Sequence, residues 1–389
     1  MSVSAYIVTM QAFTSALCKR LHCTLEQRAV DLNCRTQSLT RLRYGFSTEA
    51  TKILSTAPTL FDVARRAGVS TATVSRCVNT PERVQKQTRQ RVATAIEELG
   101  YTPNFAARVM AAKRTFTIGA VIPTMENAIF ARGLQAFQET LMERGYTLIV
   151  SSSAYRADLE AEQIRTLVAR GADGLLLIGE DRSEETYAFL RDRKVAAIAA
   201  WTYPRTSDIP CVGFDNRKSM RALADVVIGL RHRRIAYISG VIEGNDRARQ
   251  RLLGLRDAFQ ANGLDVEALR VIETPYDIEG GGDAFAALMS EDRPPTAIMC
   301  GNDVLAVGAI LRGRELGVRT PDDVAITGFD DLEIARIVDP PLATAHVPHR
   351  EMGRQAARAL IDLIEGIGAD DSIELTTTLE LRASLSKAF

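Results

Sequence analysis

Strand-like and helix-like stretches alternate from Thr115 to the end of the chain. Short runs rich in aliphatic and β-branched residues are separated by stretches in which apolar residues recur at helical spacing. The strand-like runs are FTIGAVIP, YTLIVSSS, ADGLLLIG, AAIAAW, CVGFDN, RIAYISG, LRVIET, AIMCGND and VAITGFDD. Such alternation predicts parallel β-sheets with helices on both faces. Because the pattern is longer than one doubly wound sheet usually requires, we expect two lobes with a cleft between them.

Residues 58–102 follow a different pattern, which is helical throughout. The stretch TLFDVARRAGVSTATVSRCVN combines two short helical segments. Thr59 is expected to cap the first and Ser70 the second, with Gly68 in a left-handed conformation between them. A third helix is expected at about Gln87 to Leu99. Two capped helices around a glycine turn predict a helix-turn-helix, and a plain helical hairpin is the alternative.

This segment is locally basic, although the formal net charge of the whole chain is zero. In a helix-turn-helix, the first residues of the second helix meet base edges, and arginine can bond guanine through two hydrogen bonds. We therefore expect Thr71, Ala72 and Arg76 to read bases. Phosphate contacts are expected from Ser70, Ser75 and Thr88. The expected surface is completed by Thr59, Thr73 and Asn79.

Composition limits the other classes of function. The longest apolar runs are far shorter than the ~20 residues that span a bilayer, so no membrane segment is expected. No secretory leader is recognised, so the cytoplasm is the expected location. The six cysteines show no disulfide framework. The group Cys18, His22, Cys23 and Cys34 lacks the paired spacing of a zinc site, and we expect neither a metal nor another cofactor.

Three further segments leave alternatives open. Residues 1–57 are expected to be a disordered extension, with a start codon assigned too early or an organelle-type leader as alternatives. EGGGDAF is interpreted as a helix start, with a nucleotide-phosphate site as the alternative. His232, in LRHRR, is expected to be solvated at a helix end. Because no G-x-S-x-G elbow or metal-ligand cluster accompanies the few histidines, we do not expect an enzyme.

These motifs resemble the lactose/galactose repressor family of bacterial transcription regulators. The matching residues are TLFDVARRAGVSTATVSRCVN, YTPNFAARVMA and the later GFDD, and the resemblance covers about Pro58 to Phe389. It implies an all-α helix-turn-helix headpiece (58–102), a hinge helix or linker (103–114) and a two-lobed α/β core like the periplasmic binding proteins (115–389). It also implies a homodimer, with a tetramer as the alternative, on near-palindromic double-stranded operator DNA.

The resemblance places the hinge helix in the minor groove of DNA. There an apolar side chain would wedge between base pairs and kink the duplex. The family usually has leucine at this position, and Met110 matches it here. The expected hinge contacts are Asn104, Ala107, Arg108 and Met110, and a plain linker is the alternative.

The resemblance also implies an effector site in the cleft. Several of the matching positions follow strand-like runs, and doubly wound sheets bind ligands at the carboxyl ends of their strands. The expected contacts are Phe130, Trp201, Asn245, Arg247, Arg251, Tyr276, Asn302 and Asp330. Together these amide, carboxylate, guanidinium and aromatic groups suit a polyol.

Two of these positions allow different interpretations. Trp201 stands where the family often has an acid, and it either stacks on the ligand or covers the core. Arg247 either binds the ligand or forms a surface ion pair. A missing acid beside two arginines favours an anionic sugar such as an aldonic acid. VGFDN and RHRRIAYISG look similar to the gluconate-repressor branch, in agreement with that ligand class.

We therefore expect a sequence-specific, ligand-responsive repressor of genes for carbohydrate or sugar-acid uptake and catabolism. Coupling requires that the ligand bind one arrangement of the lobes better than another. Whether the ligand releases DNA or promotes binding stays open. The alternative is a sugar-binding transport protein that uses the same two-lobed core.

Overall fold

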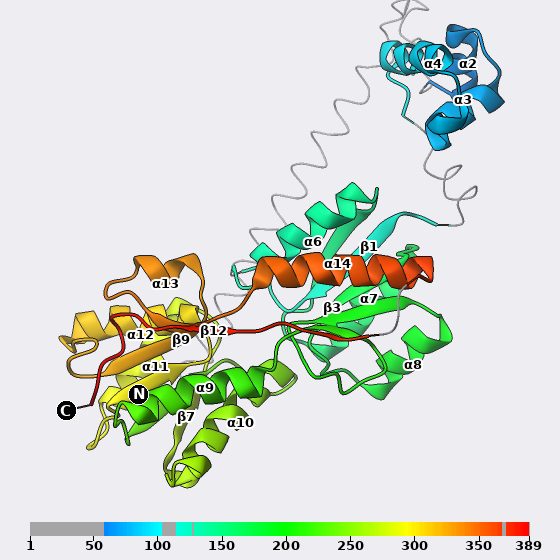
Figure 1. The fold of residues 1–389 in the computed structure, drawn as a ribbon. Helices are drawn as coiled ribbons and strands as arrows, with labels where there is room; N and C mark the ends of the chain where they lie inside the picture. The colour runs from blue at the N-terminus through cyan, green and yellow to red at the C-terminus, as the bar shows by residue number, and fades with distance from the viewer. Residues whose placement is uncertain (1–57, 103–113, 127, 368–370, 389) are drawn as a thin grey trace, which may run out of the picture. The chain divides into compact units, whose positions relative to one another are not determined.

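The chain divides into two units. The computed structural model describes residues 58–102, 114–126, 128–367 and 371–388. The first unit is Met1–Pro103 and the second is Asn104–Phe389. In the described residues, the first unit contains only helices, whereas the second holds all the strands (Figure 1). None of the helices in these ranges is both long and apolar enough to cross a bilayer.

The first unit is built from three short helices. They are α2 (Leu60–Ala67), α3 (Thr71–Asn79) and α4 (Lys86–Leu99), with a 3-10 turn, η2 (Pro81–Arg83), before α4. Their apolar faces meet in one small core formed by Val63, Ala64, Ala67, Val74, Val92, Ala95 and Tyr101. This is the predicted helix-turn-helix followed by a third helix.

Local capping explains where these helices begin and end. The Thr59 hydroxyl accepts a hydrogen bond from the N–H of Asp62 at 3.3 Å, and the Asp62 carboxylate accepts one from the N–H of Thr59 at 3.0 Å. This reciprocal pair begins α2. Ser70 begins α3 by accepting from the N–H of Thr73 at 3.2 Å. Gly68 ends α2 with a left-handed φ of 64°, which glycine adopts without a Cβ clash. The caps predicted from the sequence are present.

The second unit contains two six-stranded sheets. The first has the order β11-β5-β4-β3-β1-β2 and consists of β1 (Thr117–Ile122), β2 (Thr147–Ser152), β3 (Gly174–Ile178), β4 (Ala196–Ala200), β5 (Cys211–Gly213) and β11 (Ile373–Glu374). The second has the order β12-β10-β9-β8-β6-β7 and consists of β6 (Ile235–Ser239), β7 (Arg270–Glu273), β8 (Ala297–Cys300), β9 (Ala325–Asp330), β10 (Ala343–His346) and β12 (Thr378–Glu380). Among the described strands, β12 pairs antiparallel with β10 and the other pairs are parallel.

Helices cover both faces of the first sheet. α6 (Ala131–Glu143) and α14 (His349–Glu365) lie side by side over one face, and α7 (Ala157–Ala169) and α8 (Glu184–Asp192) cover the other (Figure 1). Along β3, alternate side chains enter the two cores: Leu176 packs with α6 and α14, and Leu175 and Leu177 pack with α7 and α8. A strand buried on both faces is apolar throughout, which explains the run GLLLI.

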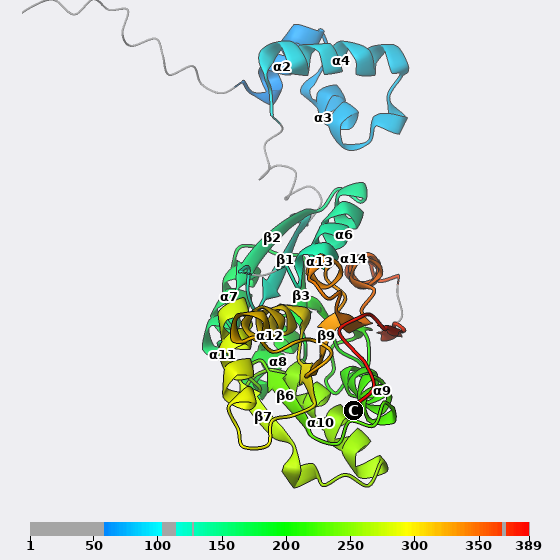
Figure 2. The ribbon, with the colours of Figure 1, turned by 90° about the vertical axis from the view of Figure 1, so that its left-hand side faces the viewer.

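The second sheet is covered in the same way. α9 (Asn216–Gly229) and α10 (Asp246–Ala261) pack together on one face, and α11 (Ile278–Met289) and α12 (Asp303–Leu316) pack together on the other (Figure 2). Two short elements, η3 (Val266–Ala268) and α13 (Glu333–Ile337), complete this lobe.

The glycine-rich segment begins α11, as interpreted from the sequence. The Asp277 carboxylate caps the helix by accepting from the N–H of Gly280 at 2.6 Å. A Cβ on Gly281 would lie 2.4 Å from the carbonyl oxygen of Leu305 in α12. These glycines therefore let the two helices pack backbone against backbone.

The chain crosses between the two lobes three times. It crosses after β5, again between β10 and α14, and finally between β11 and β12. Each lobe is therefore assembled from segments that are far apart in the sequence. The apolar core continues across the crossings, where the rings of Phe214 and Phe329 stack with centroids 6.0 Å apart.

The prediction for His232 was wrong. Its side chain is buried, and its ring nitrogens bond the hydroxyl of Thr296 at 3.0 Å and the carbonyl oxygen of Ser386 at 2.8 Å. Burial lowers the pKa of His232, so the ring is neutral at pH 7. The sequence error arose because the partners lie far along the chain and only the fold brings them to the helix end.

Candidate DNA interface and ligand cleft

The second helix of the first unit presents a polar face to solvent. Thr71, Ala72 and Arg76 of α3 are exposed, whereas Val74 on the opposite face is fully buried in the small core. Ser75 is half-buried beside them. The three residues expected to read bases thus share the exposed face of α3, where a groove of DNA could be contacted.

Several hydroxyls expected to contact DNA also serve as helix caps. The Ser70 and Thr73 hydroxyls lie 2.9 Å apart, and the Thr59 hydroxyl donates to the Asp62 carboxylate at 2.7 Å. Thr88 is half-buried in the first turn of α4. These bonds fix the start of each helix and so orient the exposed residues that follow.

Some predicted positions lie outside the described residues. They are the hinge contacts Asn104, Ala107, Arg108 and Met110, the side chain of Asn79, and the group Cys18, His22, Cys23 and Cys34. Among the residues that are described, no group of three or more His, Cys, Asp or Glu side chains is placed to hold a metal ion.

A small chamber lies at the carboxyl ends of both sheets, and we name it the inner chamber. Its volume is about 20 Å³, and it is lined by Ile129, Phe130, Tyr155, Trp201, Asn245, Arg247, Arg251, Tyr276 and Asp330. The fold therefore brings the expected effector residues together, with the exception of Asn302. Because the chamber is smaller than a sugar, a ligand can enter only if the lobes separate.

Asn302 has a structural role in this arrangement. It is fully buried, and its side-chain oxygen caps α12 by accepting from the N–H of Leu305 at 2.9 Å. Its position at the carboxyl end of β8 agrees with the sequence analysis, but it does not line the inner chamber. Contact between Asn302 and a ligand stays a prediction.

Each arginine of the inner chamber is matched by an aspartate. Arg247 Nη1 lies 2.8 Å from Asp246 Oδ1, and Arg251 Nη2 lies 3.5 Å from Asp330 Oδ1. Arg247 and Arg251 are 8% and 5% exposed, so the interpretation of Arg247 as half of a surface ion pair was wrong. The chamber therefore carries two buried cations whose charge is balanced by two buried carboxylates.

Arg251 is held rigidly by further contacts. Its Nε donates to Asn216 Oδ1 at 2.8 Å, and its Nη1 donates to the carbonyl oxygen of Gly301 at 2.6 Å. The guanidinium carbon lies 3.9 Å from the ring centroid of Phe329, within the range of a cation–π contact. Its remaining nitrogen, Nη2, is directed toward Asp330. Together these contacts fix the position in which the Arg251 guanidinium would meet a ligand hydroxyl.

Asp330 occupies an unusual position at the end of β9. Its φ is 106°, in a region that residues other than glycine rarely adopt, and its side chain is 1% exposed. Burial raises the pKa of Asp330 to about 6, although the nearby Arg251 and Arg247 act to lower it. Tyr155 and Trp201 also have positive φ, at 58° and 61°. Such backbone strain clusters where a side chain must be directed into a functional site.

Trp201 forms the back of the inner chamber. It is 1% exposed, its ring meets the edge of Phe130 with centroids 5.3 Å apart, and its Nε1 donates to His349 Nδ1 at 3.2 Å. A Cβ on Gly133 would lie 2.5 Å from the indole, so this glycine makes room for the ring. Trp201 thus belongs to the core and lines the chamber at the same time.

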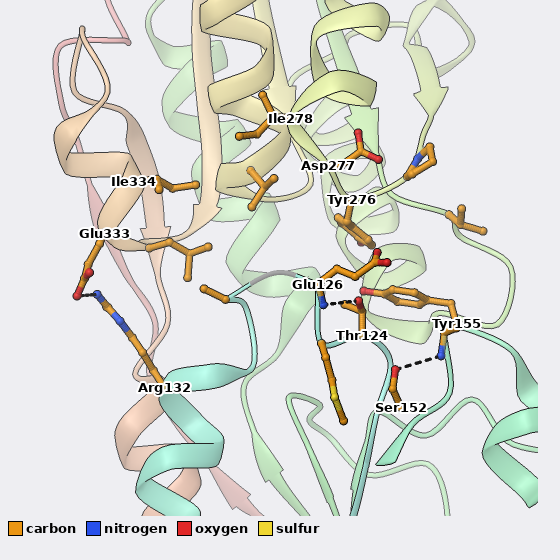
Figure 3. Close-up of a pocket in the computed structure, with 17 residues that line it drawn as sticks. Thr124, Glu126, Arg132, Ser152, Tyr155, Tyr276, Asp277, Ile278, Glu333 and Ile334 are labelled. Atoms are coloured by element: carbon orange, nitrogen blue, oxygen red, sulfur yellow. Dashed lines mark hydrogen bonds and ion pairs between the residues drawn. The ribbon is translucent and has the colours of Figure 1, made fainter. Parts of the chain in front are cut away.

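Two stacked tyrosines separate the inner chamber from a larger cavity, which we name the outer pocket. Tyr155 of the first lobe and Tyr276 of the second have ring centroids 5.7 Å apart, and both line both cavities. The outer pocket has a volume of about 950 Å³. Figure 3 shows the tyrosines on one side of it and the Arg132–Glu333 ion pair on the other.

Polar contacts hold the two lobes together around these cavities. The N–H of Glu180 donates to Asp246 Oδ2 at 2.9 Å, and Arg247 Nη1 donates to the carbonyl oxygen of Ile178 at 3.2 Å. Gly179 lies between these residues with a φ of 70°, and a Cβ there would be 1.9 Å from Arg247 Nη1. The chamber is therefore closed by the backbone of one lobe fitting against charged groups of the other.

The sequence analysis missed Tyr155, Asp246 and Gly179. A usable signal existed for Tyr155, because AYR directly follows the strand-like run YTLIVSSS. Asp246 follows Asn245 at the start of α10, and its approach to Glu180 depends on contact between the lobes. No local pattern in the sequence reveals such a contact.

Comparisons with known proteins agree with this architecture. A model of bacterial regulatory proteins of the lacI family matches residues 59–104, and a model of a periplasmic binding protein-like domain matches residues 224–385. Catabolite control protein A of Priestia megaterium is 32% identical over 84% of this chain and 98% of its own length. The HTH-type transcriptional regulator GntR of Pseudomonas aeruginosa is 31% identical over 81% of this chain and 92% of its own length. The crystal structure of the lac repressor dimer bound to operator and the anti-inducer ONPF is similar with a TM-score of 0.75 and 26% identity, over 84% of this chain and 98% of that one.

A helix-turn-helix unit joined to a two-lobed binding core defines a DNA-binding transcription regulator with an effector-binding domain. The chain belongs to the lacI family of bacterial regulatory proteins. The family and fold expected from the sequence are confirmed. The relatives are regulators of transcription rather than enzymes, and the alternative of a transport protein is not favoured.

Proposed function

We propose that this protein is a homodimeric, sequence-specific repressor of carbohydrate or sugar-acid uptake and catabolism genes in the bacterial cytoplasm. A small polyol between the lobes would control its affinity for operator DNA. The observation that carries the ligand part is the inner chamber, where Asn245, Arg251 and Asp330 meet the aromatic rings of Phe130 and Trp201. Polar groups beside aromatic faces suit a molecule with many hydroxyls and an apolar ring face.

DNA recognition is assigned to the exposed face of α3. Thr71, Ala72 and Arg76 would contact base edges in the major groove, with Arg76 bonding guanine. The hydroxyls of Ser70, Ser75 and Thr88 would contact phosphates, which position the unit without reading sequence. Thr59, Thr73, Asn79 and the hinge residues Asn104, Ala107, Arg108 and Met110 complete the proposed interface.

A dimer on a near-palindromic operator follows from this mode of binding. One helix-turn-helix reads only a few base pairs, so two copies related by a two-fold axis are needed for a specific site. The similarity to the lac repressor dimer bound to operator supports this assembly. A tetramer is the alternative, and sedimentation of the complex with a single operator distinguishes the two.

The charge balance of the inner chamber favours a polyol with at most one negative charge. Both arginines already pair with aspartates. A ligand with several negative charges would therefore have to displace these aspartates and would leave their carboxylates without a matching cation. A sugar acid requires Arg251 to exchange Asp330 for the ligand carboxylate. Because the pKa of Asp330 is raised to about 6 by burial, protonation below that pH frees Arg251 for this exchange. Binding of a sugar acid should therefore tighten as the pH falls from 7 to 6, and binding of a neutral sugar should change less.

The ligand would act on the arrangement of the lobes. The contacts of Glu180, Asp246 and Arg247 hold the lobes closed, and a bound polyol would replace or extend them. A ligand shifts such an equilibrium only by as much as it prefers one arrangement. The sign of the effect on DNA binding is measured directly by adding the ligand to the operator complex.

A thermal-shift screen with sugars, sugar acids and sugar phosphates tests the ligand part. A ligand that binds only the folded protein raises the melting temperature. The response should disappear in Arg251→Gln, which alters the chamber, and persist in Arg256→Gln. Arg256 is a suitable control because it lies on the same helix, is exposed and does not line the chamber. A response that survives Arg251→Gln, or no response to any class, contradicts the proposed ligand site.

Selection of DNA from a random pool tests the operator part. The selected sites should share a near-palindrome, and binding should saturate at one dimer per site. Selection of sequences without two-fold symmetry contradicts the dimer model.

A further inference from the structure

The outer pocket is large enough to hold more than a sugar. Its volume of about 950 Å³ lies within the range of about 300–1,000 Å³ that is common for small-molecule sites. Its walls come from the loops after β1, β2, β6 and β7 and from the starts of α6, α11, α12 and α13. Figure 3 shows the labelled residues of these walls. Both lobes contribute, and the Tyr155–Tyr276 stack lies between this pocket and the inner chamber. A ligand that occupied the inner chamber would thus have a second space directly beside it.

Exposed aliphatic side chains converge on this pocket. Met125, Val241 and Ile278 are 59%, 44% and 48% exposed, although apolar side chains of this size are usually covered. Met125 lies on the loop after β1 in the first lobe. In the second lobe, Val241 lies on the loop after β6 and Ile278 begins α11. Single exposed apolar residues are ordinary, but a group that lines one cavity is typical of a binding surface.

The charges around the pocket disfavour an anion. Among the described residues that line it, the acidic ones are Glu126, Asp277 and Glu333, and the basic one is Arg132. Arg132 Nη2 already pairs with Glu333 Oε1 at 2.7 Å. A phosphate or carboxylate in the pocket would meet the remaining acids without a matching cation. The charges therefore disfavour an anion, and the apolar side chains of Met125, Val241 and Ile278 favour a neutral group over a cation.

The two tyrosines offer an aromatic surface for a ring. Their rings stack at an interplanar angle of 28°, and each reaches the outer pocket. Burial raises the pKa of both phenols, so they are neutral at pH 7. A neutral ring placed against them would bury apolar area and gain the geometry-dependent attraction of an aromatic pair.

We propose that the ligand of the cleft is a polyol that carries a neutral ring, with the polyol in the inner chamber and the ring in the outer pocket. Aryl glycosides and nucleosides share this chemistry. The two-part ligand rests on the proposed function of the inner chamber. The preference of the outer pocket for neutral rings is a property of its own walls and is testable separately.

Ring binding is tested by ligand-observed NMR with benzyl alcohol and benzoate, a neutral and an anionic probe of similar size. Wild-type protein should bind benzyl alcohol at millimolar concentration and benzoate at least about tenfold more weakly, because the rim is acidic. Ile278→Glu should weaken the binding of benzyl alcohol by about tenfold, because it removes apolar area from the pocket wall. Leu381→Glu is the matched control, because Leu381 is 58% exposed and does not line the pocket.

Neutralising the rim gives the second arm of this test. The double variant Glu126→Gln and Asp277→Asn should bring the affinity for benzoate close to the affinity for benzyl alcohol, because it removes two negative charges from the rim. Asn is chosen at 277 because it can still cap α11. The pocket assignment is overturned if wild type binds neither probe, if it binds both equally, or if Ile278→Glu has no more effect than Leu381→Glu.

Matched ligand pairs test the link between the two cavities. Thermal shift compares two kinds of matched pair. In the first, a phenyl glycoside is compared with the methyl glycoside of the same sugar. In the second, a nucleoside is compared with methyl riboside. A stronger response to the phenyl glycosides identifies a glycoside, and a stronger response to the nucleosides identifies a nucleoside. Equal responses within each pair, including none, overturn the two-part ligand. If methyl glycosides still bind, the proposed function survives that result.

Discussion

The indole nitrogen of Trp201 donates a hydrogen bond to Nδ1 of His349 at 3.2 Å, and both side chains are buried. Because Nδ1 accepts this bond, the His349 ring is neutral and carries its proton on Nε2. Burial lowers the pKa of His349 to about 3, in agreement with a neutral ring. The pair joins the end of β4 to the start of α14, two segments that lie far apart in the sequence. It fixes the indole at the back of the inner chamber.

Trp201 should report ligand binding by its fluorescence. The chain contains a single tryptophan, and its ring lines the inner chamber. Emission of the free protein should resemble that of indole in an apolar solvent, and it should change in a saturable way with any ligand that enters the chamber. Binding of a ligand detected by calorimetry without a change in this emission would place the ligand elsewhere.

The Asp330→Asn variant should be more stable than wild type at neutral pH. The pKa of Asp330 rises from 3.8 in the unfolded chain to about 6 in the fold because of burial, so the charged form destabilises the fold above pH 6. At pH 7 the free energy of unfolding should rise by about 2–3 kcal/mol, since one pKa unit corresponds to about 1.4 kcal/mol. The gain should shrink as the pH falls below 6 and vanish well below 3.8, where wild-type Asp330 is protonated in both states.

Asp323→Asn provides the control of opposite sign. Hydrogen bonds from Arg319 lower the pKa of Asp323 to about 2, so its charged form stabilises the fold at neutral pH. This variant should be less stable than wild type at pH 7, with the difference fading as the pH falls from 4 to 2. Thermal unfolding at several pH values measures both variants. A stability gain for Asp330→Asn that is the same at pH 4.5 and pH 7 would falsify the burial explanation.

Gly179→Ala should disrupt the closed arrangement of the lobes. A Cβ at residue 179 would lie 1.9 Å from Arg247 Nη1 and 2.3 Å from Asp246 Oδ1. Gly145→Ala is the matched control, because Gly145 has a similar φ of 75° but nothing within 4 Å of the added carbon. Both variants place alanine at a positive φ, so this backbone strain cancels in the comparison. The clash with Arg247 and Asp246 should lower the unfolding free energy of Gly179→Ala by about 1–3 kcal/mol more than that of Gly145→Ala. Equal costs in denaturant unfolding would show that Arg247 and Asp246 move aside easily.

Arg76→Ala should weaken specific DNA binding. Loss of a bidentate contact to guanine costs about 1–3 kcal/mol on the selected operator and much less on random DNA of the same length. Arg66→Ala is the control, because Arg66 is also exposed but its Nη2 pairs with Glu98 at 2.7 Å. Fluorescence anisotropy with both DNAs at one salt concentration measures the difference. Equal losses on both DNAs would mean that Arg76 contacts only phosphate.

Thr59→Ala should loosen α2 without unfolding the core. The substitution removes the acceptor for the N–H of Asp62 and costs about 1 kcal/mol of local stability. Thr59→Ser keeps the hydroxyl and should behave like wild type. Amide hydrogen exchange of the full chain measures the effect, and faster exchange is expected only in α2. Unchanged exchange in Thr59→Ala would mean that tertiary packing alone sets the start of this helix.

The sequence predicted the elements whose signals are local. The caps at Thr59 and Ser70 and the turn at Gly68 depend on residues within one or two helical turns, and they were predicted correctly. The nine strand-like runs correspond to β1 through β9. Seven of these strands are almost wholly buried, and a strand covered on both faces is apolar along its length, whereas the edge strands β2 and β7 are partly exposed. The strands β10, β11 and β12 were missed. They are two to four residues long and carry no such run.

Most of the chamber could be located because the family resemblance implied which positions face the cleft. Trp201 and Asp330 lie at the ends of strand-like runs of the first and the second sheet, so the strand pattern alone places each of them only at the carboxyl edge of its own sheet. Asp246 and His232 could not be placed correctly, because their environment is created by residues from a distant segment. The matching of each arginine by an aspartate depends on side-chain directions that no spacing rule encodes.

The three crossings between the lobes determine the order in which a newly made chain gains its two activities. The core of the helix-turn-helix unit is complete at Tyr101, and a growing chain folds its first units first. The first sheet, by contrast, waits for α14 and β11, and the second waits for β12, which leaves the ribosome after the other strands of the described chain. Each new molecule therefore completes its helix-turn-helix fold well before it completes the cleft between the lobes.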